Sequence, residues 1–425
     1  MSPAALVASF VAMMAGGVPV AIAMAGASLL YVMVTKSVPD FVIIHRMYGG
    51  VDSFPLLAVP FFILAGNLMN SAGITNRIYN FALAAVGWLK GGLGHVNVVG
   101  SMIFAGMSGT AIADAAGLGT IEIKAMKDHG YSTEFAVGVT AASSTVGPII
   151  PPSLPFVIYG MMAGVSIGQL FLAGVVPGFI MAIAMMAMVT WYAHRRGYQR
   201  DAVFSLPRLA RTFAHAFLAM LTPVLLVGGM TMGVFTPTEG AIVASLYALF
   251  LGLVWYRTLD WRMLVKITME TVETTAVVLF IVASASIFGW LLTVTRVTDM
   301  VAQAVLSLTT NPYVFLLLAN GLLLFVGLFL ETVAAITLLV PILVPICQKL
   351  GVDLVHFGII MVLNLMIGLL TPPVGTVLYV LARISKLSFE RTVVAVAPWL
   401  IPLLATLALV TYAPALVLWL PKQLF

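Results

Sequence analysis

The residues best suited to chemistry in this sequence form four short polar islands within long apolar stretches. Each island contains hydroxyl, amide or carboxyl side chains, and three of the four also contain glycine or proline. They are GMSGT (106–110) with Asp114, SSTVG (143–147), Glu331 with Thr332, and Asn364 with GLLTPP (368–373). Polar groups in hydrocarbon are costly, so each island requires a role.

Ion coordination is the chemistry that these islands favour. A double proline follows Gly147 and another follows Gly368, and proline breaks the hydrogen-bond ladder of a helix. Carbonyls near Gly147–Ile150 and Gly368–Thr371 therefore lose their partners. With neighbouring hydroxyls they offer hard oxygen ligands suited to Na⁺, while the N-termini of half-helices attract an anionic substrate. Helix kinking and close packing are the structural alternative, but four islands in two related pairs favour function.

The composition places these islands in a membrane. The chain is 62% hydrophobic and 8% charged, and its apolar runs are long enough to cross about 30 Å of hydrocarbon. Continuous runs, without strand alternation, predict an all-α polytopic membrane protein and not a β-barrel. The net charge of +5 is a topology signal and predicts no nucleic-acid partner, because five arginines cluster in segment 194–215 against one aspartate. The positive-inside rule places this segment in the cytoplasm.

A repeat divides the chain. Pro151–Pro152 match Pro372–Pro373 at a distance of 221 residues (372 minus 151), and Ser143 matches Asn364 at the same distance. Two repeats are typical of secondary transporters. An inverted pair is the favoured arrangement; it requires an odd number of crossings between equivalent segments, a number that the sequence leaves open.

Each half contains the same predicted elements. Segment 94–126 would be about 50 Å long as one helix, so its polar middle favours a re-entrant hairpin. The predicted halves are 1–193, with a hairpin at about 93–126 and a broken helix at about 131–165, and 216–425, with a hairpin at about 311–347 and a broken helix at about 355–382. The basic cytoplasmic loop 194–215 separates them.

Two motifs suggest other roles. GMSG (106–109) fits the pattern of an intramembrane serine protease using Ser108, but none of the six histidines lies in a polar island to serve as the base. TPTE (236–239) predicts a helix start with a capping box, because threonine precedes proline and a glutamate follows three positions later. The single cysteine, Cys347, excludes an internal disulfide and a multi-cysteine metal site.

In order and spacing, four motifs resemble the large membrane subunit (DctM-like) of tripartite ATP-independent periplasmic (TRAP) transporters. They are AGMSGTAIADAAGLGT (105–120), STVGPIIPPS (144–153), VFTPTEGAIVASLYAL (234–249) and GLLTPPVG (368–375). The resemblance implies an elevator-type, Na⁺-driven importer of carboxylate-bearing organic anions in a bacterial inner membrane. It also implies a periplasmic substrate-binding protein and a small four-helix membrane subunit, which we expect to be a separate chain. The alternative is a stand-alone ion-coupled anion symporter or antiporter.

The islands and the resemblance together give the expected site residues. The first Na⁺ site is expected at Ser108, Thr110, Ser143, Gly147 and Ile150. The second is expected at Gly327, Glu331, Thr332, Gly368 and Thr371. Candidate substrate contacts are Ser144, Thr145, Asp114 and Asn364. Apart from Na⁺ as coupling ion, no metal or cofactor is expected.

Overall fold

The structure, a computed structural model, describes residues 3–36, 38–39 and 41–424, without the side chains of Pro3 and Ser108. Within these residues the chain forms helices joined by short connections, with an isolated bridge between Lys90 and Arg200. Seven described helical segments are long and apolar enough to cross a membrane. They are Phe54–Ser71, Ile167–Arg196, Leu206–Thr231, Pro237–Trp255, Trp261–Val294, Thr332–Lys349 and Phe389–Tyr412.

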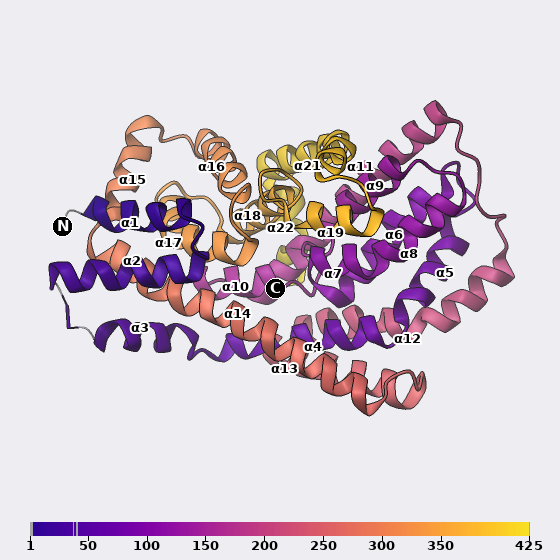
Figure 1. Ribbon diagram of the computed structural model, residues 1–425, viewed down its shortest axis with the longest axis horizontal. Coiled ribbons are helices and arrows are strands. Elements are labelled where there is room, and N and C mark those ends of the chain that lie inside the picture. The colour runs from indigo at the N-terminus through magenta and orange to yellow at the C-terminus, as the bar shows by residue number, and fades with distance from the viewer. Residues whose placement is uncertain (1–2, 37, 40, 425) are drawn as a thin grey trace.

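Four helices form one side of the molecule. They are α4 (Ala58–Ser71), α12 (Leu206–Thr231), α13 (Pro237–Phe250) and α14 (Trp261–Val294). Figure 1 shows α14 running across the lower part of the view; α4 packs against α14 and α13, and α13 packs against α12. The start of α13 is fixed by the predicted capping box: Thr236 accepts from the Glu239 backbone, and the Glu239 side chain accepts in return. This prediction is confirmed.

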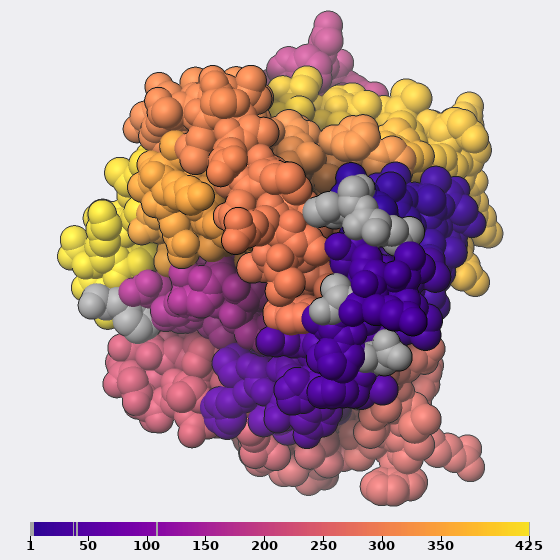
Figure 2. Space-filling model, turned by 90° about the vertical axis from the view of Figure 1, so that its left-hand side faces the viewer, coloured from indigo at the N-terminus to yellow at the C-terminus, as the bar shows by residue number. Residues whose placement is uncertain are grey.

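The N-terminal segment consists of three helices at one end of the molecule. Helices α1 (Pro3–Ala15) and α2 (Val20–Thr35) are separated at GGVP, and α3 (Phe41–Val51) follows. Helices α2 and α3 pack on α14, and the rings of Phe10 and Phe288 lie 5.1 Å apart. Figure 2 shows these indigo helices beside the orange segment at that end.

The predicted hairpin regions and broken helices form the opposite layer. The first set is α6 (Gly92–Ser108), α7 (Ala111–Ala116), α8 (Leu118–Asp128), α9 (Thr133–Ser144) and α10 (Leu154–Ala163). The second set is α16 (Pro312–Gly327), α17 (Thr332–Lys349), α18 (Leu354–Gly368) and α19 (Thr376–Ser385). The start of α17 follows the start of α7 by 221 residues (332 minus 111), the distance that separates the two double prolines. The Pro151–Pro152 and Pro372–Pro373 peptide bonds are both cis.

The centre of the protein is built around α9 and α18. Every residue from Phe135 to Ser144 and from Val355 to Gly368 is buried. Helices that touch other protein on all sides have no lipid-facing stripe, which agrees with the lack of amphipathic patterning in both sequences. The polar side chains on these two helices are therefore enclosed by protein.

The remaining helices connect and cover these layers. They are α5 (Ile74–Val86), α11 (Ile167–Arg196), α15 (Val297–Leu308), α20 (Phe389–Val396), α21 (Leu400–Tyr412) and α22 (Pro414–Leu424), with short turns at Phe54–Leu57, Leu251–Trp255 and Ala397–Trp399. The basic segment 194–215 is not a loop throughout. Helix α11 continues to Arg196 and α12 begins at Leu206, because Ser205 caps α12 and Pro207 suits its first turn. The connection is thus only 197–205.

Candidate ion and substrate site

The turns of the two hairpin regions meet at one cavity. The first hairpin tip (residues 108–110) joins α6 to α7, and the second hairpin tip (residues 327–332) joins α16 to α17. The cavity has a volume of about 50 Å³. It is lined from both tips and both broken helices by Gly109, Thr110, Ala111, Ile112, Pro148, Leu154, Pro155, Glu331, Thr332, Val333, Met366 and Leu369. The sequence suggested one site in each half; the cavity is shared by both.

The first hairpin tip rests on the first break (residues 145–153). Gly109 has φ +61°, and a Cβ there would lie 2.7 Å from the Pro152 carbonyl oxygen, so a side chain has no room. A Cβ on Gly147 would lie 3.5 Å from the Thr110 carbonyl oxygen. Backbone carbonyls and the Thr110 hydroxyl, which caps α7, therefore gather where the tip meets the break. Ser108 ends α6, and its side chain lies outside the described residues.

The carbonyls of the first break are partly used. Ser153 caps α10 and donates its hydroxyl to the Pro148 carbonyl. The Ile149 carbonyl oxygen lies 2.1 Å from the position that a Cβ on Gly174 would occupy, so α11 passes very close to the break. Ile150, also in the break, packs against Gly178 of α11. Helix α11 therefore fixes the backbone on which the first predicted Na⁺ site depends.

The second hairpin tip rests on the second break (residues 369–375) in a similar way. A Cβ on Gly368 would lie 2.7 Å from the Gly327 carbonyl oxygen, so the two backbones are in direct contact. The Val374 N–H donates to the Leu328 carbonyl (3.2 Å), and the Thr371 hydroxyl donates to the Gly368 carbonyl (2.9 Å). Of the residues predicted for the second Na⁺ site, Gly327, Gly368 and Thr371 lie at this contact, whereas Glu331 and Thr332 line the shared cavity.

Glu331 and Thr332 give the second tip its polar groups. The Glu331 carboxylate accepts from the backbone N–H groups of Val333 (2.9 Å) and Ala334 (3.4 Å) and so caps α17. The buried Thr332 hydroxyl has no hydrogen-bond partner among the described residues. A buried hydroxyl without a partner is costly, which makes Thr332 available to a bound ion or water.

A buried polar network that the sequence reasoning missed joins the first hairpin region to α9. The Asn97 amide donates to Glu122 and to the Thr140 hydroxyl (2.8 Å), and its oxygen accepts from Ser143 (2.7 Å). Ser101 donates to Ser143 (3.1 Å). The available signal was the presence of Asn97 and Ser101 at helical spacing in an apolar segment, but their partners lie far away in sequence.

Two carboxylates of this hairpin region lack compensation. Asp114 and Glu122 are each 1% exposed. Both Asp114 carboxylate oxygens and one Glu122 oxygen have no hydrogen-bond partner among the described residues. Buried charges are normally paired or bound to a cation. Among the described residues, no three histidine, cysteine or carboxylate side chains lie close enough together to hold a metal ion.

The corresponding network in the second half is uncharged. Asn364 donates to the Asn320 side-chain oxygen (2.8 Å), and Asn320 donates to the Thr411 hydroxyl (2.9 Å). These bonds fix α18 to α16 and α21. Of the predicted substrate contacts, Asn364 is therefore engaged in helix packing in this conformation.

The other predicted substrate contacts, Ser144, Thr145 and Asp114, are also absent from the lining of the cavity. The Ser144 hydroxyl donates to the Ala141 carbonyl and the Thr145 hydroxyl to the Ala142 carbonyl, and both side chains are fully buried. Serine and threonine commonly satisfy their hydroxyls in this way within helices. The structure thus brings Thr110, Glu331 and Thr332 to the cavity and encloses the 143–145 island.

Within the described residues, seven helical segments long and apolar enough to span a membrane, together with two hairpin tips that meet broken helices at a shared cavity, indicate a multi-pass membrane transport protein. The family model described as "Tripartite ATP-independent periplasmic transporter, DctM component" matches residues 7–416. The chain belongs to this family, as a large permease subunit of a TRAP transporter. It is therefore a transporter permease and not an enzyme, which confirms the prediction of a transporter over an intramembrane protease.

Named relatives extend this assignment. The chain is 48% identical to the sialic acid TRAP transporter large permease protein SiaM of Vibrio cholerae, over 96% of this chain and 95% of that protein. It is 42% identical to the sialic acid TRAP transporter permease protein SiaT of Haemophilus influenzae, over 96% of this chain and 66% of that protein. It is 34% identical to the C4-dicarboxylate large permease DctM of Rhodobacter capsulatus, over 97% of both.

A solved structure shares the fold. The crystal structure of the Alcanivorax borkumensis YdaH transporter matches with a TM-score of 0.63 and 15% identity, over 88% of this chain and 87% of that chain. At this identity the likeness concerns the fold alone. Membership of a tripartite family implies two further components, a small membrane subunit and a periplasmic binding protein, and is consistent with a bacterial inner membrane.

Proposed function

We propose that this chain couples inward Na⁺ flow to the import of a carboxylate-bearing organic anion. The observation that carries the proposal is the shared cavity, where hydroxyls and carboxylate oxygens of two hairpin tips lie beside carbonyl-rich breaks in two buried helices. Such a set of oxygen atoms suits Na⁺, and the start of α7 at Thr110 offers N–H groups to an anion, whereas the Glu331 carboxylate already occupies those of α17.

The two Na⁺ sites follow the contacts between tips and breaks. We assign the first to Ser108 and Thr110 with Ser143, Gly147 and Ile150. We assign the second to Gly327, Glu331 and Thr332 with Gly368 and Thr371. Support comes from the Gly109–Pro152 and Gly327–Gly368 contacts, which bring the carbonyls of each tip next to those of a break.

The anion is assigned to the shared cavity. A cavity of about 50 Å³ accommodates only a few water molecules, so the two tips must separate before an organic anion enters. In that open conformation the expected contacts are Ser144, Thr145, Asp114 and Asn364. Sialic acid is the first substrate to test, because two relatives with 48% and 42% identity are named as sialic acid transporters.

The motion that we propose is an elevator movement. Two inverted repeats would each contribute one hairpin and one broken helix to a mobile domain, which would slide along α4, α12, α13 and α14. The similar offsets between the starts of corresponding helices, for example 221 residues from α7 to α17 and from α9 to α18, support the repeats, and the layering of Figure 1 supports the division. The arginines around the 197–205 connection favour a cytoplasmic position for it. The small subunit is proposed to be a separate chain.

Uptake of radiolabelled sialic acid into proteoliposomes tests the function. The vesicles contain this chain with its small subunit, and the binding protein is added outside. Uptake is expected to require an inward Na⁺ gradient and to fall strongly for Ser108→Ala, Ser143→Ala and Thr371→Ala. Ser307→Ala, on an exposed surface, is the matched control. Unchanged uptake by the three site variants would refute the ion sites, and full uptake without the binding protein would favour a stand-alone symporter.

A further inference from the structure

The 197–205 connection between α11 and α12 is fastened to the chain that leads into α6. The Asp201 N–H donates to the Gly87 carbonyl (3.1 Å), and the Gly91 N–H donates to the Gln199 carbonyl (3.0 Å). These backbone bonds hold the connection against the base of the first hairpin region, at the end of α6 that lies away from the hairpin tip.

The side chain of Asp201 holds the beginnings of two helices. One carboxylate oxygen accepts from the Leu93 N–H (2.9 Å), at the start of α6, and from the Tyr131 hydroxyl (2.6 Å), just before α9. The first N–H groups of a helix have no partner within it, and a negative charge beside them is stabilising. A Cβ on Gly92 would lie 2.9 Å from the same oxygen, so the carboxylate is in direct contact with the first turn of α6.

Tyr198, in the same connection, adds a second tie to the start of α9. Its hydroxyl accepts from the Ser132 N–H (3.2 Å), and its ring centroid lies 4.3 Å from that of Tyr131. Val203 is 86% exposed, so the fastened part of the connection ends before it. We call the contacts of Asp201 and Tyr198 with the starts of α6 and α9 the base clamp.

The two clamped helices run in parallel from the base clamp to the candidate site. Asn97 of α6 bonds to Thr140 of α9 (2.8 Å), and Ser101, one turn further along α6, bonds to Ser143 (3.1 Å). Helix α6 ends at the first hairpin tip, about 23 Å from its start, and α9 leads into the first break. Because helices transmit displacements as rigid elements, their alignment at the base affects how the tip meets the break.

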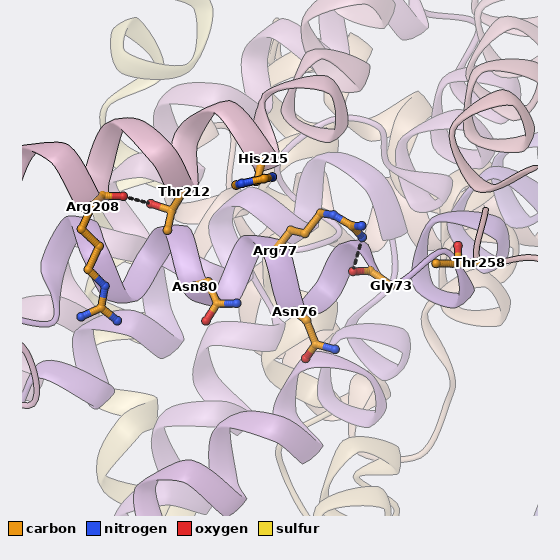
Figure 3. Close-up of a pocket in the computed structure, with 8 residues that line it drawn as sticks. All are labelled: Gly73, Asn76, Arg77, Asn80, Arg208, Thr212, His215 and Thr258. Atoms are coloured by element: carbon orange, nitrogen blue, oxygen red, sulfur yellow. Dashed lines mark hydrogen bonds between the residues drawn. The ribbon is translucent and has the colours of Figure 1, made fainter. Parts of the chain in front are cut away.

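The other end of the connection is held differently. Beyond it, α12 faces α5 across an open polar pocket of about 510 Å³ (Figure 3). The hydrogen bonds drawn there run from Arg77 to the Gly73 carbonyl and from Thr212 to the Arg208 carbonyl (2.9 Å each), so each stays within one segment. Among the residues that line this pocket, no hydrogen bond joins α5 to α12. The polar bonds of the connection therefore favour the first hairpin region over α12.

We propose that Asp201 is a positioning residue for the first Na⁺ site and acts on it through α6 and α9. This inference rests on the Na⁺ site proposed above. Without the base clamp the two helices can shift relative to each other, so fewer molecules have a tip and a break that match the ion. The apparent affinity for Na⁺ falls by the fraction of competent molecules, whereas saturating Na⁺ restores the competent arrangement.

A Na⁺ titration of uptake in the same proteoliposomes tests this role. Asp201→Ala should raise the Na⁺ concentration for half-maximal uptake about fivefold, the usual effect of a lost hydrogen bond, and keep the maximal rate within about twofold. Asp201→Asn retains an oxygen that can accept both hydrogen bonds and should restore most of the wild-type Na⁺ requirement. Asp128→Ala, at an exposed position at the end of α8, is the matched control. A wild-type Na⁺ requirement in Asp201→Ala, or a fall in its maximal rate alone, would overturn the proposal.

Hydrogen exchange followed by mass spectrometry tests the base clamp without transport. In Asp201→Ala the amides of Leu93 and Ser132 should exchange about tenfold faster than in wild type, whereas Asp201→Asn and Asp128→Ala should change them little. Unchanged exchange in Asp201→Ala would overturn the clamp.

Tyr131→Phe keeps the test valid even if Asp201→Ala does not fold. It removes one of the two hydrogen bonds to the Asp201 carboxylate and should give a Na⁺ requirement between those of wild type and Asp201→Ala. A wild-type requirement in Tyr131→Phe would contradict the role of the tie to α9. Wild-type uptake that needs no Na⁺ would refute the proposed function, whereas the exchange rates would still decide whether Asp201 holds both helices.

Discussion

Gly368→Ala tests the contact between the second hairpin tip and the second break. The new Cβ would lie 2.7 Å from the Gly327 carbonyl oxygen and 2.8 Å from the Gly327 Cα, where ordinary contacts are 3.4–4 Å. Both neighbours are backbone atoms, so α16 and α18 must separate by roughly 0.7 Å, and such overpacking costs about 1–3 kcal/mol. The helix preference of alanine over glycine returns about 0.5–1 kcal/mol. We expect a net loss of stability of up to about 2.5 kcal/mol, centred near 1 kcal/mol.

Two glycines of α16, Gly321 and Gly327, allow three alanine variants to be ranked by their stability. A Cβ on Gly321 meets no atom within 4 Å, so Gly321→Ala should stabilise the protein by about 0.5–1 kcal/mol. A Cβ on Gly327 would lie 3.2 Å from the Gly368 Cα, which is a milder overlap. Unfolding temperatures in detergent should therefore fall from Gly321→Ala through Gly327→Ala to Gly368→Ala.

The same three variants test the proposed second Na⁺ site through the Na⁺ concentration that uptake requires. A displacement of roughly 0.7 Å separates the carbonyls assigned to Na⁺, and a loss of about 1.4 kcal/mol in ion binding corresponds to a tenfold higher Na⁺ requirement for uptake. Gly321→Ala should keep the wild-type requirement. An unfolding temperature for Gly368→Ala at or above that of Gly321→Ala would refute the backbone contact. A Gly368→Ala protein that is destabilised but keeps its Na⁺ requirement would refute the assignment of the second Na⁺ site.

Three further changes address other interactions. Glu331→Ala removes the N-cap of α17 and should cost about 1 kcal/mol in thermal unfolding, whereas a smaller loss for Glu331→Asp would show that the carboxylate acts as the cap. Asn97→Ala leaves several buried partners unsatisfied and should cost about 1–3 kcal/mol by the same measurement; a neutral result would contradict the network. Burial and the hydrogen bond to Asp201 raise the pKa of Tyr131 above its usual value near 10, so the stability that its protonated hydroxyl provides is present below pH 10 and is lost as the pH rises further. Tyr131→Phe should therefore unfold about 1 kcal/mol more easily at pH 8, with the difference to wild type shrinking above pH 10.

The local elements of this protein are largely readable from its sequence. Proline pairs, cap residues and abrupt changes in polarity act over a few residues, so the break after Ser144 and the start of α13 at Pro237 follow from their own neighbourhoods. The basic segment shows the limit of such reasoning. Its charge indicated a loop over 194–215, but arginine is a good helix former and Ser205 supplies a cap, so much of the segment is helical.

The site depends on partners that the sequence does not reveal. Asn97 and Thr140 are 43 residues apart, and nothing near either residue indicates their hydrogen bond. The meeting of both hairpin tips at one cavity likewise depends on how the two halves pack together. The hydroxyls of Ser144 and Thr145 suggested a binding role, whereas their nearest acceptors are carbonyls of their own helix. Spacing thus predicts where polar groups occur but not which groups they meet.

The buried carboxylates of the first hairpin region have an electrical consequence. Asp114 and Glu122 have no basic partner among the described residues, and the matching network around Asn364 carries no charge. Moving one elementary charge across the membrane involves about 2.3 kcal/mol per 100 mV. If this region crosses the electric field of the membrane with both carboxylates ionised and no cation bound to them, an inside-negative potential drives it outward with about 5 kcal/mol per 100 mV. Two bound cations would cancel that force. The occupancy of this pair then determines whether the loaded or the empty carrier responds to the membrane potential.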